Sequence, residues 1–162
     1  MTQQKFWEII EASWAASPNL YSKRVDALKT NEEELLQELS EELEKIILAN
    51  YKNQLMVLDK PELTKFIHIL EERLYNIDRE EIHEYTDGSD DGFLYCRCFI
   101  LGMGAQYYNM IDEDPSKATM DLWAESFGFS PYVIYQEKFG DEFSRNSIHC
   151  IESCSNKDSW DH

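Results

Sequence analysis

Apolar residues recur at three- and four-residue steps along most of the chain, which is the spacing of one face of an α-helix. The clearest stripe covers residues 35–50 and predicts a long amphipathic helix. Asn31 and Glu34 precede this stripe with the spacing of a capping box, so the helix is expected to begin there. The opposite face is either solvated or a docking surface for a positive partner. Its acidic residues are Glu33, Glu38, Glu41, Glu42 and Glu44.

Similar stripes predict two helices before this segment. Thr2 is suited to cap the first one, which should end near Ser17 because Pro18 disfavours helical geometry in the preceding residue. A second, short helix is expected over residues 20–29. The side chains that it should bury are Tyr21, Val25 and Leu28.

Further helix starts follow the long stripe. Asp59, with Pro61 and Glu62 in the first turn, predicts a helix over the next apolar stripe. Asp78 and Glu81 repeat the capping spacing before a shorter apolar pair. The buried face expected after Asp59 consists of Leu63, Phe66, Ile67, Leu70 and Leu74.

The second half of the chain continues as helices. A turn is expected at residues 86–88, a helix from Ser89 to about residue 109, and another from 112–115 through Met120, Leu122 and Trp123. The only β-rich run, residues 132–135, is short. The pattern therefore predicts an all-α fold with a single compact domain of about six or seven helices. Residues 1–152 should form this domain, and the polar residues 153–162 a flexible C-terminal tail.

Charge narrows the classes of partner. The 162 residues include 15 basic and 32 acidic side chains, a net charge of −17. Such a surface disfavours nucleic acid and anionic membranes, and it attracts cationic proteins in a salt-dependent way. Acidity also occurs in proteins that are merely soluble. No stretch approaches the length of a membrane helix and no secretory signal is seen, so a cytoplasmic protein is expected.

The segment from Ser89 to Arg97 is the most informative in the chain. Ser89 suits an N-cap position, and Asp90 and Asp91 would then lie at the positive end of the helix dipole. Arg97 lies on a partly apolar face, which suggests a buried ion pair with an acidic residue of another element. The residues expected to face inward are Phe93, Arg97, Ile100, Leu101 and Gly104.

Unlike side chains at fixed offsets form a motif here: Ser89, Asp90, Asp91, Gly92, Phe93, Tyr95, Arg97, Ile100, Gly104, Tyr108, Asp114 and Pro115. The motif resembles the central signature of the bacterial family catalogued as domain of unknown function 4240, and the opening Phe6, Trp7, Ile9, Ile10 and Glu11 is similar to the usual start of that family. The resemblance implies a helical cytosolic domain and no reaction. The chain departs from the family pattern at residues 78–85, which are charged where relatives usually have an apolar, Trp-containing helix.

The candidate chemistry favours structural roles. Asp90 and Asp91 are adjacent at a helix start, where a catalytic carboxylate pair would need two different environments. No nucleotide, dinucleotide, zincin or EF-hand motif occurs, so neither a cofactor nor a metal is expected. His149 and the four cysteines contain zinc-binding atoms with poor spacing, and free thiols are the preferred interpretation. The cysteines are Cys96, Cys98, Cys150 and Cys154.

These observations favour a non-enzymatic acidic protein that binds another protein, as a candidate immunity or antitoxin protein that neutralises a basic bacterial toxin. The chain has 4 Trp, 9 Tyr and 8 Phe, and aromatic anchors within an acidic rim are typical of binding hot spots, although the rings also suit a core. The residues expected at the contact are Glu38, Glu41, Glu42, Asp87, Asp90, Asp91, Tyr107, Tyr108 and Trp123.

Two alternatives come from other classes. The first is a regulatory or accessory domain that senses a small ligand or a metal, for which ligand-induced thermal stabilisation would be diagnostic. The second is a hydrolase built around Asp90, Asp91 and a distant histidine, which would require a deep pocket holding those groups. Neither the identity of the partner nor the oligomeric state follows from the sequence.

Overall fold

Helices and connecting loops, without a β-strand, form the part of the chain that this computed structural model describes, residues 1–86, 89–145 and 147–160. The predicted all-α fold with a single compact domain is confirmed. The elements are α1 (Gln3–Ala15), α2 (Pro18–Thr30), α3 (Glu33–Glu42), η1 (Leu43–Ile47), α4 (Leu48–Met56), α5 (Lys60–Asn76), α6 (Glu80–His83), α7 (Asp90–Gly102), α8 (Ala105–Glu113), η2 (Pro115–Lys117), α9 (Glu125–Phe139) and η3 (Lys157–Ser159).

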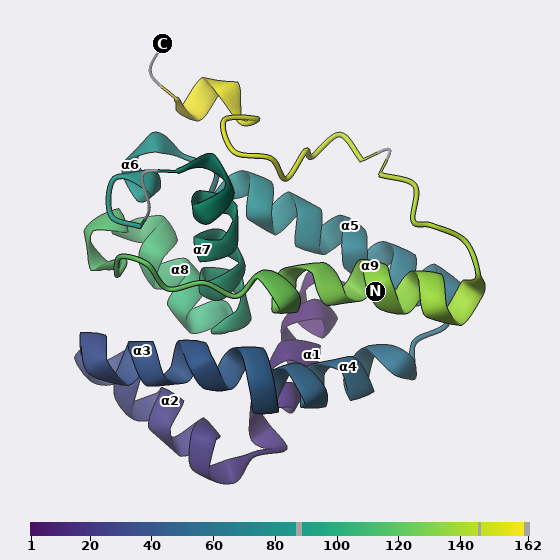
Figure 1. The fold of residues 1–162 in the computed structure, drawn as a ribbon, viewed down its shortest axis with the longest axis horizontal. Helices are drawn as coiled ribbons and strands as arrows, with labels where there is room; N and C mark the ends of the chain where they lie inside the picture. The colour runs from purple at the N-terminus through teal and green to yellow at the C-terminus, as the bar shows by residue number, and fades with distance from the viewer. Residues whose placement is uncertain (87–88, 146, 161–162) are drawn as a thin grey trace.

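The long helix predicted over residues 35–50 is present as α3, η1 and α4, which form one continuous rod (Figure 1). The middle part, η1, is a π-helix. The rod contacts α2 through α3, and α1 and α9 through α4, while α9 also contacts α5 and α7. The buried stripe of the rod, which includes Leu36, Leu39, Leu43 and Ile47, therefore faces the centre of the domain.

Local capping signals placed three helix starts correctly. Thr2 accepts a hydrogen bond from the backbone N–H of Lys5 at the start of α1. Asp59 and Glu62 form a reciprocal capping box at the start of α5. Ser89 Oγ accepts a hydrogen bond from the backbone N–H of Gly92 at the start of α7. Each cap satisfies backbone donors that the first helical turn leaves unpaired.

The capping box predicted at Asn31 and Glu34 is wrong. Asn31 adopts a left-handed conformation, with φ of 52°, and ends α2 instead of starting α3. Its side chain donates to the Lys117 carbonyl, and Glu32 is the N-cap residue of α3. The prediction failed because asparagine is common at both the start and the end of helices. Only its contacts with the rest of the fold distinguish the two positions.

The face that α2 buries also differs from the prediction. Arg24 and Ala27 are its buried residues, whereas Tyr21 is exposed and Val25 and Leu28 are only half-buried. The Arg24 guanidinium forms two hydrogen bonds with the Glu11 carboxylate, of 2.6 and 2.9 Å, and donates to the Met103 carbonyl. An arginine side chain can be buried when its charge is paired in this way. The spacing of apolar residues does not predict such a buried arginine.

The helix expected from Ser89 to about residue 109 is broken into α7 and α8 at Gly104. This glycine has a φ of 94°, and a Cβ atom there would lie 2.6 Å from Glu11 Oε1 and 2.8 Å from Arg24 Nη1. The ion pair between α1 and α2 therefore occupies the space of a side chain, and both backbone and space require glycine. The helix expected from 112–115 through Trp123 is reduced to the short η2, and residues 118–124 form a loop.

The chain after α9 returns along α5 and ends near α6 and α7 (Figure 1). Asp78, expected to cap a helix, is instead fully buried and accepts hydrogen bonds of 3.0, 2.7 and 3.0 Å from the backbone N–H groups of Cys154, Ser155 and Asn156. Cys154 has a φ of 66°, which helps these three successive donors to converge on one anion. Trp160 Nε1 also donates to Asp78. Residues 153–160, expected to be flexible, are thus docked on the domain.

Close packing of α7 against α9 gives a first prediction. A Cβ atom at Gly128 would overlap Cys98 Sγ and lie 3.0 Å from Cys98 Cβ. Both residues are buried, so Gly128→Ala is expected to lower the free energy of unfolding by about 1–3 kcal/mol through overpacking. Denaturant unfolding measures the loss. Adding Cys98→Ala should restore part of it, because the new methyl group then takes the space of the thiol. Equal stability of Gly128→Ala and the unchanged protein would contradict this packing.

Candidate functional site

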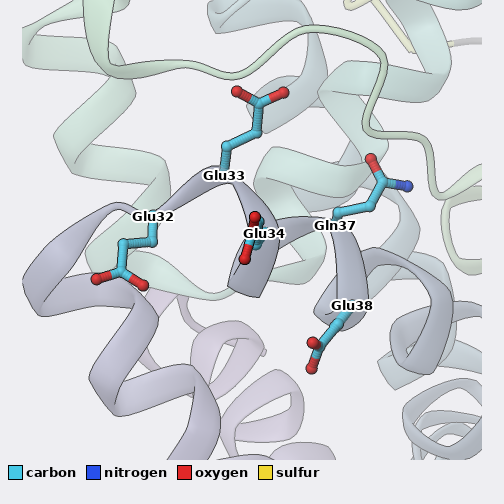
Figure 2. A pocket seen from close by; sticks show the side chains of 5 residues that line it. All are labelled: Glu32, Glu33, Glu34, Gln37 and Glu38. Atoms are coloured by element: carbon cyan, nitrogen blue, oxygen red, sulfur yellow. The ribbon is translucent and has the colours of Figure 1, made fainter.

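The acidic face of α3 is the most strongly charged surface that the sequence analysis singled out. We define it by its exposed carboxylates, which are Glu32, Glu33, Glu34, Glu38 and Glu41. A pocket of about 780 Å³ opens on it, lined by Gln37 and by all of these glutamates except Glu41 (Figure 2). Glu33 and Gln37 point to one side of the helix and Glu38 to the other, so the negative charge spreads around the outer surface of α3 (Figure 2).

Basic side chains compensate little of this charge. Lys23 of α2 pairs with Glu38 at 2.5 Å, while among the described residues Glu33 and Glu41 form no ion pair. Glu42, also predicted at the contact, is half-buried. Glu44, further along the same helix, is turned inward and accepts a hydrogen bond from the backbone N–H of Ser126. Burial raises the pKa of Glu44, and its hydrogen bonds to residues 126 and 127 oppose that rise.

The loop between η2 and α9, residues 118–124, is held by hydrogen bonds of the elements on either side of it. The Asn31 side chain donates to the Lys117 carbonyl at 2.9 Å, and the backbone N–H of Ser126 donates to Glu44 at 3.0 Å. These two bonds join η2 and α9, the elements on either side of the loop, to the end of α2 and to η1, which precede and follow α3. Trp123 lies on this loop, is 48% exposed and contacts the Tyr95 ring edge-on at 6.3 Å. An exposed tryptophan is typical of a binding surface.

Two of the carboxylates predicted at the contact, Asp90 and Asp91, belong to α7, the helix that Trp123 contacts through Tyr95. Asp90 and Asp91 are exposed in the first turn of α7, where they complement the helix dipole. Burial, the Glu125 charge and, more weakly, the Asp91 charge raise the pKa of Tyr95. Trp123 therefore packs against α7 through Tyr95, one helical turn after Asp91. Asp87, predicted with this group, lies outside the described residues.

Tyr107 and Tyr108 lie in the core, each 1% exposed. Tyr107 packs edge-on against Phe99, and the Tyr108 hydroxyl donates to the Arg73 carbonyl at 2.7 Å. Burial raises the pKa of both hydroxyls. Of the three aromatic anchors predicted for a partner, only Trp123 is therefore available at the surface of this structure.

Arg97 is fully buried, as its place in an apolar stripe suggested, but the expected ion pair is wrong. Its guanidinium donates to the carbonyls of Leu74 and Ile151, at 2.8 Å each, and lies over the Phe93 ring at 4.8 Å. Among the described residues no carboxylate forms a direct ion pair with it. Burial lowers the pKa of Arg97, and the charge of Asp78 acts in the opposite direction. Arg97 therefore joins α5 to the C-terminal segment.

The four cysteines differ in burial. Cys96 and Cys98 are buried, Cys150 and Cys154 are exposed, and none of the four forms a disulfide within the described residues. Burial raises the pKa of Cys98 to about 12, which makes its thiol a poor nucleophile. Within residues 1–86, 89–145 and 147–160 no three His, Cys, Asp or Glu side chains are grouped so that they could hold a metal ion.

One buried acidic residue escaped the sequence analysis. Glu71 is 2% exposed and lies within the apolar stripe of α5, between Leu70 and Leu74. A glutamate inside such a stripe is itself a signal, because carboxylates are seldom fully buried without partners. It lines a small cavity beneath the segment that follows α9.

Comparison with known proteins gives one match. The sequence model of the family described as "Protein of unknown function (DUF4240)" matches residues 1–132. No curated protein and no solved structure matches the chain. In the described part of the chain, the helices are too short or too polar to cross a membrane.

Proposed function

The chain belongs to the DUF4240 family of proteins of unknown function, and from this premise we propose that it is a non-enzymatic protein that binds a positively charged protein through the acidic face of α3. The observation that carries the proposal is the position of Trp123, exposed on the loop whose flanking elements, η2 and α9, are hydrogen-bonded to Asn31 and Glu44 on either side of α3. The carboxylates would steer a cationic partner to the surface, and the indole would supply buried contact area after encounter.

We propose further that the partner is a basic bacterial toxin, so that the chain acts as an immunity or antitoxin protein in the cytoplasm. A net charge of −17 supports binding to a strongly cationic protein. A protein that neutralises a toxin only has to cover it, so it needs no catalytic residues. The described residues of the acidic face are exposed carboxylates that are not arranged for catalysis. Capture with tagged protein from a lysate of the source bacterium, at low and high salt, tests this. A single basic toxin that is lost at high salt is the expected result.

Reversing charges on the acidic face should slow binding to the captured partner. The triple variant Glu33→Lys, Glu34→Lys and Glu41→Lys is expected to lower the association rate constant by about tenfold or more at low salt, because it removes electrostatic steering. The dissociation rate constant should change by only about twofold, since these side chains are exposed. Stopped-flow or surface-plasmon measurements at several salt concentrations separate the two rates.

A matched control reverses three exposed glutamates elsewhere, Glu84, Glu113 and Glu137, and changes the net charge by the same amount. An equal slowing by both triple variants would show that net charge alone acts and would exclude the acidic face as the docking surface. At about 0.5 M salt the difference between the variants should vanish, because the Debye length is then only a few ångströms.

A ligand-sensing role is the second candidate, and one observation favours it. Glu71 lines the small cavity beneath the segment after α9, and one of its carboxylate oxygens is buried without a hydrogen-bond donor, which is uncommon in a folded protein. This cavity involves no residue of the acidic face, so the two candidate functions can be tested separately.

A further inference from the structure

Three large apolar side chains are exposed on two adjacent segments, the turn after α6 and the loop before α9. Tyr85 is 42% exposed, Met120 49% and Trp123 48%, and we call these three residues the loop surface. The backbone N–H of Asp121 donates to the Thr86 carbonyl at 3.0 Å, so the two segments lie side by side. Single exposed apolar residues are normal in soluble proteins, whereas several on adjoining segments indicate a binding surface.

The loop that carries Met120 and Trp123 is held firmly against the domain. The backbone N–H of Ala124 donates to the Tyr95 carbonyl at 3.1 Å, and the Trp123 ring contacts the Tyr95 ring edge-on. Leu122 and Ala124 are buried on either side of the exposed Trp123. Because the loop is already ordered, little conformational entropy is lost when a partner covers it, which favours affinity.

Exposed carboxylates border the loop surface. Two of them are chain neighbours of Tyr85 and Met120, and the other two interact electrostatically with the Tyr95 hydroxyl. They are Glu84, Asp121, Asp91 and Glu125. Among the described residues none of them forms an ion pair. The segments around the loop surface contain one lysine or arginine, Arg97, and it is buried; these segments are residues 80–86, 89–97 and 118–125.

We propose that the loop surface docks a basic amphipathic helix of a partner protein. Such a helix presents a row of apolar side chains with lysine or arginine on both sides of it. The apolar row would cover Met120 and Trp123, and the basic side chains would face the bordering carboxylates. A second copy of this chain is a poor occupant because each copy has a net charge of −17, and an anionic membrane is repelled for the same reason.

This inference rests on the proposed function, because Trp123 is the apolar anchor in both. It adds the kind of segment that the partner presents, and it assigns the electrostatic contact to carboxylates outside α3. Charge reversal on α3 and removal of the apolar side chains of the loop surface are therefore expected to have different effects on the same ligand.

The test titrates the full chain into dye-labelled synthetic peptides of about 18 residues, or five helical turns, and follows fluorescence anisotropy at low salt. The first peptide has leucine on one helical face and lysine on the other. Two related peptides replace lysine by glutamate or leucine by serine. We expect the leucine–lysine peptide to bind about tenfold or more tightly than either relative, because only this peptide matches both the apolar side chains and the carboxylates.

Variants assign the binding to the loop surface. Trp123→Ala should weaken binding of the leucine–lysine peptide by about tenfold or more, and the double variant Tyr85→Ser with Met120→Ser by a similar factor, because apolar anchors carry much of the binding energy. The matched control is Met56→Ser with Val133→Ser, two side chains that are each 48% exposed on α4 and α9. It should change binding by less than about twofold. All five side chains are exposed, so the variants should remain folded, which circular dichroism checks.

Several results would overturn the inference. No saturable binding of the leucine–lysine peptide, or equally tight binding of the serine–lysine peptide, would mean that the loop surface does not recognise a basic amphipathic helix. Equal weakening by the Met56 and Val133 control would place the contact elsewhere. Peptide binding that is lost in the charge-reversed α3 variant but kept in the Tyr85 and Met120 variant would refute the loop surface and leave the proposed function standing. The proposed function fails separately, if the captured partner is insensitive to charge reversal on α3.

Discussion

Asp78→Asn is expected to lower the free energy of unfolding by about 3–5 kcal/mol, the range for breaking a buried charged arrangement by removing one partner. The Asp78 carboxylate is fully buried and accepts hydrogen bonds from three successive backbone N–H groups and from the Trp160 indole. An asparagine amide keeps one acceptor atom, but it turns two N–H groups toward these donors. It also removes the negative charge that acts on buried Arg97.

The loss should be largest at the C-terminal segment. If Asp78 holds residues 153–160, hydrogen exchange and proteolysis in that segment will increase before the rest of the domain unfolds. Denaturant unfolding gives the global value, and the two measurements together separate local release from global destabilisation.

Asp141→Asn is the matched control, because Asp141 is exposed and makes only a surface ion pair of 3.4 Å with Lys60. Its cost should be under about 1 kcal/mol. If Asp78→Asn cost no more than this control, and the segment kept its protection, the role assigned to Asp78 would be refuted.

Arg97→Met is expected to cost a similar amount, about 3–5 kcal/mol. The variant leaves the carbonyls of Leu74 and Ile151 without their shared donor in a buried place. Methionine fills much of the volume, so the expected loss comes from hydrogen bonds and charge more than from a cavity. Thermal or denaturant unfolding measures it.

Arg97→Lys serves as the conservative comparison. Lysine keeps the charge but lacks the planar fork that lets one guanidinium reach both carbonyls, so an intermediate loss is expected. The double variant Asp78→Asn with Arg97→Met should cost at least about 1 kcal/mol less than the sum of the single variants, because neither leaves the other's charge uncompensated. Strict additivity would mean that the two buried charges do not interact.

Two residues of the family motif, Ser89 and Arg97, have a structural role in this chain. Ser89 caps α7, and Arg97, two turns further on, holds a segment near the C-terminus. The match to the family covers residues 1–132, whereas the segment that Arg97 and Asp78 hold lies beyond it. Arg97, a residue of the motif, therefore holds a part of the chain that lies outside the matched region.

Helix starts at residues 2, 59 and 89 were predictable because each depends on a side chain within three residues of the backbone group that it satisfies. The buried stripes of the long rod and of α5 were predictable for a related reason, since helical periodicity places their residues on one face whatever the partner helix is. The acidic face of α3 followed from the same periodicity. The all-α fold class and the exposed carboxylates are thus properties of local sequence.

Contacts between residues far apart in the chain decided the rest. The break at Gly104 depends on an ion pair between Glu11 and Arg24, and Asp78 finds its donors 76 to 78 residues later. Tyr107 and Tyr108 became core residues because other helices cover them, while Glu71 and Arg145 meet at one cavity only after the segment following α9 folds back along α5. The sequence by itself determined where helices form and which faces are charged. Only the tertiary structure decided which polar groups are buried and what pairs with them, because those pairings depend on distances that no local pattern encodes.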